Sequence, residues 1–78
     1  MNEKKYCRLR HSVTKDEVQL VEDYVDGLHM IRHFFAEAKD GLFREINQQP
    51  CRNDEVFGAM WSDTLKGYKG LNWEVIDE

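Results

Sequence analysis

The stretch of residues 14–39 constrains the fold of this chain more than any other. It opens with Thr-x-x-Glu, in which the Thr14 hydroxyl can accept from the N–H of Glu17 and the Glu17 carboxylate can reach back, as in a helix capping box. The apolar residues that follow recur at helical spacing: Val18, Leu20, Val21, Tyr24, Val25, Leu28, Ile31, Phe34 and Phe35. This pattern predicts one long amphipathic helix over residues 14–39, continuing through Gly27 because the apolar stripe keeps its phase there.

Two shorter helices are predicted after the long one. A Lys-Asp-Gly sequence ending at Gly41 is a stop signal, because glycine readily adopts the left-handed conformation that ends many helices. Apolar residues then predict a helix over residues 42–48, which ends before Pro50 because the residue preceding a proline disfavours the α conformation. Asn53 is a good N-cap for a third helix, predicted over residues 53–66.

The two ends of the chain read as short strands. Residues 4–13 alternate between apolar and polar side chains, and Leu71, Trp73 and Val75 alternate in the same way. The first segment is basic and the last is acidic, so the two are expected to pair as a ribbon. The sequence therefore predicts a single domain, residues 1–78, of the helix-rich α+β class with three helices and a terminal ribbon. An all-α bundle is the alternative.

Composition and charge narrow the classes of function. The chain has 78 residues and a net charge of −4, and five of its eleven Lys and Arg residues lie in residues 1–15 with a single acidic residue. No secretory signal and no apolar stretch long enough to span a bilayer is visible. We therefore expect a cytoplasmic protein without a membrane partner, whose two cysteines are reduced thiols.

No pattern of residues predicts catalysis or a bound cofactor. A nucleophile needs a base and an orienting group nearby. Cys7 and His11 could share a face of the first strand, but no oxyanion hole is visible in the sequence. Phosphate-binding glycine loops are absent as well. We expect a protein that is not an enzyme and carries no cofactor.

A metal site is one alternative function. His29 and His33 are four residues apart in the predicted long helix, on the same side as Glu22 and Asp26. Imidazole and carboxylate groups together are ligands for zinc, iron or manganese. A small metal-binding protein using His29 and His33 therefore remains open.

Nucleic-acid binding is the second alternative. Lys4, Lys5, Arg8 and Arg10 surround an aromatic ring in the basic N-terminal segment, as in sites that follow a phosphate backbone and stack bases. The acidic remainder of the chain opposes this reading, because it repels phosphates.

The reading we favour is a small acidic protein-interaction module that regulates, inhibits or adapts a larger protein. Its aromatic residues exceed what a three-helix core needs, and aromatic side chains are common interface anchors. The partner is another protein or a second copy of the chain, as in a homodimer, and the size and charge are typical of small regulators from phages or mobile elements. The expected contact residues are Asp16, Glu22, Asp23, Asp26, Phe43 and Trp61.

Overall fold

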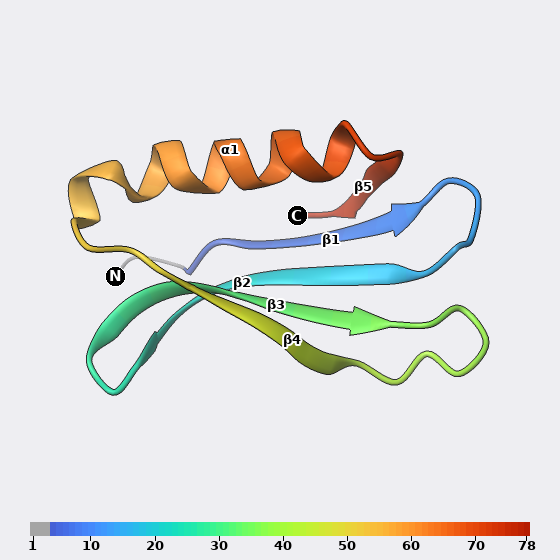
Figure 1. Cartoon of the computed structure of the whole chain (residues 1–78), viewed down its shortest axis with the longest axis horizontal. Coiled ribbons are helices and arrows are strands. Elements are labelled where there is room, and N and C mark those ends of the chain that lie inside the picture. Colours follow the sequence, from blue (N-terminus) through green and yellow to red (C-terminus); the bar gives the residue numbers. More distant parts are fainter. Residues whose placement is uncertain (1–3) are drawn as a thin grey trace.

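The computed structural model describes residues 4–78 and consists of one antiparallel sheet with one helix lying on it (Figure 1). The elements in chain order are β1 (Tyr6–His11), β2 (Glu17–Val25), β3 (Leu28–Ala36), β4 (Arg44–Pro50), the 3₁₀ turn η1 (Asp54–Val56), α1 (Phe57–Lys69) and β5 (Trp73–Asp77). The strand order is β4-β3-β2-β1-β5, and every neighbouring pair is antiparallel. The helix α1 connects the two outermost strands across one face of the sheet.

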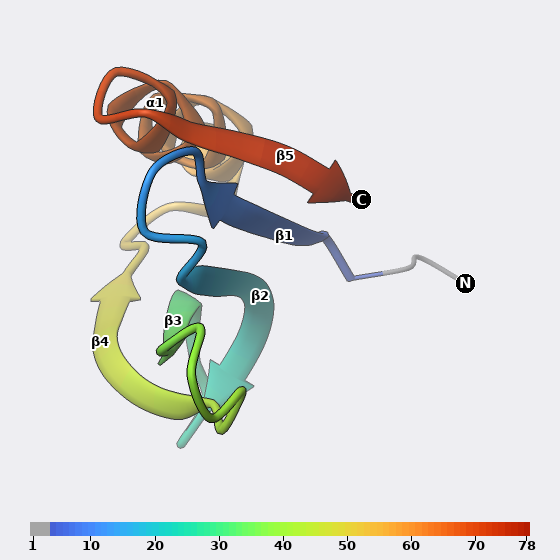
Figure 2. The ribbon, with the colours of Figure 1, turned by 90° about the vertical axis from the view of Figure 1, so that its right-hand side faces the viewer.

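The core lies between α1 and the face of the sheet that it covers. Figure 2 shows that the sheet curls toward the side on which α1 lies. Alternate residues of the central strands point to this side, because side chains along a strand alternate between faces. The buried apolar residues of this cluster are Cys7, Leu9, Val18, Leu20, Ile31, Cys51, Phe57 and Trp61.

The prediction of a long helix over residues 14–39 is wrong, because this segment forms strands β2 and β3. The two strands pair from Glu17↔Ala36 to Val25↔Leu28 around a two-residue turn. Both faces of the hairpin carry apolar side chains, and these together produced the helix-like spacing. Long-range pairing with β1 and β4 favours the extended form, as do the β-branched residues of β2.

The residues expected to form the helix cap instead shape the turn between β1 and β2. The Thr14 hydroxyl accepts from the N–H of Asp16, at 3.2 Å, and Lys15 adopts a left-handed φ of 67°. Glu17 does not reach back to the chain, because its carboxylate binds Arg8 and Arg10 of the neighbouring strand. These contacts form the local turn that a Thr or Ser hydroxyl often supports.

The predicted helix over residues 42–48 is also wrong, because this segment is strand β4. The left-handed conformation predicted for Gly41 is present, with φ of 66°, but it closes a turn after β3. There the N–H of Gly41 donates to the carbonyl of Glu37. The short apolar run could not distinguish a strand from a helix by its spacing alone.

The helix predicted over residues 53–66 is present with shifted bounds. The side chain of Asn53 accepts from the N–H of Glu55, at 2.9 Å, and so caps η1 as predicted. The helix α1 then continues to Lys69, which places Gly67 inside it. No helix among residues 4–78 is long and apolar enough to cross a membrane.

The pairing of the two terminal strands is confirmed, although within a larger sheet. Leu9 lies opposite Val75 and His11 opposite Trp73, with a bulge between Arg8 and Leu9. The fold is therefore mostly β, with one α-helix packed on a five-stranded sheet. It is neither helix-rich nor an all-α bundle, and the description of the chain as helical is wrong.

Candidate functional site

The described chain buries two histidines, and one of them, His29 at the start of β3, lies between two carboxylates. Its side chain is 7% exposed and is stacked between the rings of Tyr24 and Phe57, with centroids 4.5 Å and 4.1 Å away. Its Nδ1 lies 2.7 Å from Asp54 Oδ1, and its Nε2 lies 2.7 Å from Glu22 Oε2. Ionised carboxylates only accept hydrogen bonds, so this arrangement favours the imidazolium form of His29, in which both ring nitrogens carry a proton.

The pKa of His29 reflects two opposing effects. Burial by itself lowers this pKa, because it disfavours the charged form. The hydrogen bonds to Glu22 and Asp54 act in the opposite direction and outweigh it, so the pKa lies above its ordinary value. His29 therefore joins β2, β3 and η1 through a charged centre.

His33, on the same face of β3, is a neutral counterpart. Its Nε2 donates to Gln49 Oε1, at 3.1 Å, and its Nδ1 accepts from the Tyr68 hydroxyl, at 2.8 Å. Burial lowers the pKa of His33 and raises the pKa of Tyr68, so both groups remain uncharged near neutral pH. This polar chain ties β3 and β4 to α1.

The two histidines expected to share a metal ion do not lie together. Four residues along a strand span about 13 Å, whereas four residues along a helix bring side chains into contact. Both nitrogens of each ring are also occupied by protein partners. Within residues 4–78 no group of three or more His, Cys, Asp or Glu side chains is arranged to hold a metal ion.

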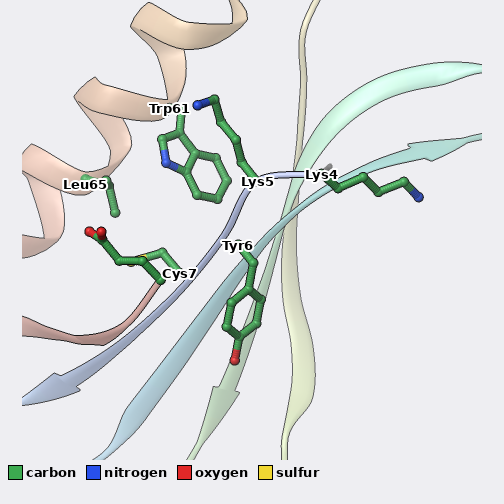
Figure 3. Close-up of a pocket in the computed structure, with 7 residues that line it drawn as sticks. Lys4, Lys5, Tyr6, Cys7, Trp61 and Leu65 are labelled. Carbon is green, nitrogen blue, oxygen red and sulfur yellow. The ribbon is translucent and has the colours of Figure 1, made fainter. Parts of the chain in front are cut away.

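The cations expected to contact nucleic acid are divided between the two faces of the sheet. Arg8 and Arg10 lie on the face that α1 leaves open, where both bind the carboxylate of Glu17. Lys4 pairs with Asp23, at 2.8 Å. Lys5 lies on the other face, beside Trp61 (Figure 3). The structure therefore does not gather these four cations into one basic strip.

The four acidic residues expected to meet a partner are also dispersed, and three of them have internal roles. Asp16 accepts from the N–H of Ala38, at 2.9 Å, and Glu22 binds His29. Asp23 lies between Lys4 and Arg32, and the hydrogen bond from Lys4 is the largest cause that lowers its pKa to about 2.

Asp26 and the two aromatic residues expected in the interface do not share a surface either. Asp26 is exposed in the turn between β2 and β3. Phe43 is half-buried under the guanidinium of Arg8, 5.6 Å from its ring centroid. Trp61 is buried in the core at 7% exposure. The expected contact residues therefore do not form a common patch.

A groove between α1 and strand β4 is the feature that sequence reasoning missed. It has a volume of about 320 Å³ and is lined by Gln49, Asp63, Thr64, Gly67, Tyr68 and Leu71. Leu71 is 67% exposed, and a Cβ at Gly67 would meet nothing within 4 Å. The groove therefore has an apolar end wall and a flank where the helix carries no side chain.

Strand β4 borders this groove with an unpaired backbone edge. Figure 2 shows β4 at one border of the sheet, on the same side as α1. The N–H of Cys51 donates to His29, so the alternation of an antiparallel ladder turns the N–H and C=O of Gln48 away from β3. Pro50 faces the same way, as prolines in edge strands do. Gln48 thus offers both backbone groups to an added strand.

Comparisons with known proteins give no indication of the function. No protein-family model, curated protein or solved structure matches this chain.

Proposed function

We propose that this protein is a non-catalytic interaction module that captures an extended segment of another protein along the edge of strand β4. Two observations carry the proposal: the groove between α1 and β4, which Gln49 lines on the strand side, and the outward-facing backbone of the neighbouring Gln48. A segment added to β4 would form main-chain hydrogen bonds with that edge, while every second side chain enters the groove. Both parts of such a site, the edge and the side-chain pocket, are present.

The groove favours a segment with an apolar residue two positions from a basic one, because side chains on one face of a strand are two residues apart. Tyr68 and Leu71 supply an apolar surface, and the missing side chain at Gly67 leaves room for a large one. Asp63 lines the rim and forms no salt bridge among residues 4–78. A Lys or Arg in the segment would pair with Asp63, which also agrees with the net charge of −4.

The open face of the sheet supports nucleic-acid binding less well. Its cations Arg8, Arg10 and Arg32 each face a carboxylate of the same face. Releasing them for phosphates would break these internal pairs. A salt-dependent binding site for nucleic acid needs cations that are free to contact phosphate.

The Gln48→Pro variant tests strand addition directly. Of the backbone hydrogen-bonding groups, proline removes only the outward N–H of Gln48, so the bonds between β3 and β4 stay intact. Gln48→Ala is the matched control, because it removes the side chain and keeps the N–H. Peptides selected from a random display library on the wild-type protein should bind Gln48→Ala like the wild type and Gln48→Pro about tenfold more weakly, a loss of about 1.4 kcal/mol.

Hydrogen exchange and a groove variant complete the test. The free Gln48 amide should exchange quickly and become protected when a selected peptide binds. Gly67→Leu should block binding by filling the groove, whereas Gly58→Leu, also without neighbours within 4 Å, should not. Equal binding of these peptides to the wild type, Gln48→Pro and Gly67→Leu would refute strand addition. A dimer that Gln48→Pro dissociates in light scattering would instead identify a second copy as the partner.

A further inference from the structure

A second cavity lies away from the groove, between the first residues of the sheet and α1. It has a volume of about 360 Å³ and is lined by Lys4, Lys5, Tyr6, Cys7, Trp61, Leu65 and Glu78. Cavities that hold small ligands start at about 300 Å³ and combine apolar walls with a few polar groups. Here Trp61, Leu65 and Cys7 supply an apolar wall beside several charged groups, and the volume is at the lower end of the range for small-molecule sites (Figure 3).

The indole N–H of Trp61 is an unused donor in this cavity. The side chain is 7% exposed, and its N–H makes no hydrogen bond with another residue of 4–78. Trp61 lines the cavity. Figure 3 shows the nitrogen on the side of the ring nearer Leu65. Buried tryptophans usually satisfy this N–H, so a bound acceptor would complete the site.

Two opposite charges flank this donor. The side chain of Lys5 runs alongside the indole, and its ammonium forms no salt bridge among the described residues (Figure 3). Glu78 also lines the cavity, and its charge contributes to raising the pKa of Cys7, after the larger effect of burial. The neighbouring Lys4 points away and is paired with Asp23.

We propose that this cavity binds a small zwitterion with an apolar side chain, of the α-amino-acid type. Its carboxylate would accept from Lys5 and from the Trp61 N–H, its ammonium would face Glu78, and its side chain would lie against Leu65. A simple anion would be repelled by Glu78, and a simple cation by Lys5. This site is separate from the β4 groove, and neither proposal depends on the other.

Nuclear magnetic resonance of the indole N–H groups tests the proposal. The chain has two tryptophans, and Trp73 does not line the cavity, so it serves as an internal control. Titration with L-phenylalanine should shift the Trp61 signal to saturation and leave the Trp73 signal in place. Phenethylamine, which lacks the carboxylate, and 3-phenylpropanoate, which lacks the amine, should each bind about tenfold more weakly, because each loses one charged contact.

Variants separate this site from an unspecific effect. Lys5→Gln and Glu78→Gln should each weaken L-phenylalanine about tenfold, and Lys4→Gln should not. Gln48→Pro should leave this binding unchanged, which keeps the test independent of the peptide site. The absence of any Trp61 shift up to about 10 mM ligand, or equal binding of 3-phenylpropanoate, would overturn the proposal. Equal losses in Lys4→Gln and Lys5→Gln would do the same.

Discussion

The pKa values of the two buried histidines of β3 should be shifted in opposite directions from the ordinary value. His29 is held between two carboxylates, which raise its pKa above the ordinary value of about 6.5 despite the opposing effect of burial. Burial is the largest effect on His33, and its pKa lies below that value. Replacing both carboxylates, as in Glu22→Gln with Asp54→Asn, should therefore lower the pKa of His29 and leave that of His33 in place.

The exposure of each carboxylate determines how much its hydrogen bond to His29 adds to the free energy of unfolding. The carboxylate of Glu22 is 17% exposed, so its bond to the imidazolium should stabilise the fold by about 2 kcal/mol. Asp54 is 71% exposed, so solvent screening limits its bond to at most about 1 kcal/mol. In Glu22→Gln the amide oxygen can still accept from the N–H of Lys5, which confines the loss to the histidine contact.

These shifts predict a maximum in the pH dependence of stability. A raised folded-state pKa means that the contribution of His29 is fully present below about pH 6.5 and is lost as pH rises through the folded-state value. The lowered pKa of His33 acts in the reverse direction, so its contribution is lost as pH falls below about 6.5. The free energy of unfolding should therefore decline on both sides of this region.

Two measurements check this prediction. Ring-proton titration by nuclear magnetic resonance gives the pKa of each histidine, and urea denaturation between pH 5 and 9 (roughly the range in which histidine titrates) gives the free energy of unfolding. Glu22→Gln should cost about 2 kcal/mol at the acidic end and less at the alkaline end, whereas Glu55→Gln, beside Asp54, should cost little at either. A His29 pKa below that of His33, or a pH-independent loss in Glu22→Gln, would refute the reasoning.

Three substitutions test other parts of the fold by urea denaturation. Gly67→Ala should raise the free energy of unfolding by about 0.5–1 kcal/mol, because Gly67 is inside α1 and has no neighbour within 4 Å of a Cβ; a loss would show that the site is constrained. Tyr68→Phe should cost about 1–2 kcal/mol, because it leaves the buried Nδ1 of His33 without a donor; no loss would remove this bond from the account. Leu9→Ala should cost about 2–5 kcal/mol, because Leu9 is 0% exposed, and a value near zero would contradict its place in the core.

The parts of the fold that the sequence predicted correctly depend on neighbouring residues. The cap at Asn53 and the left-handed Gly41 follow from local chemistry, and both are present. Alternation also identified the two terminal strands. Strands β2, β3 and β4 depend instead on which segments pair, and a single sequence does not reveal those partners.

The candidate site could not be predicted from the sequence either, because it too depends on which segments pair. Gln49 and Gly67 line one groove, yet they lie in different elements, and the sheet order brings them together. The four-residue spacing of His29 and His33 was real, but its meaning depended on whether the segment was a helix or a strand. In the sequence, only Pro50 marked the edge strand, since proline is confined to such positions in sheets.

A single substitution distinguishes the hairpin from the helix predicted over residues 14–39. Asp26 and Gly27 have φ of 52° and 77°, the positive values that a two-residue hairpin turn requires. A Cβ at Gly27 would meet nothing within 4 Å, so Gly27→Ala changes only the backbone preference. In a helix this change would stabilise the protein by about 1 kcal/mol, whereas in the left-handed turn it should cost about 1–2 kcal/mol. With Gly67→Ala as the helical control, urea denaturation should give opposite signs for the two glycines, and a gain at both positions would contradict the hairpin.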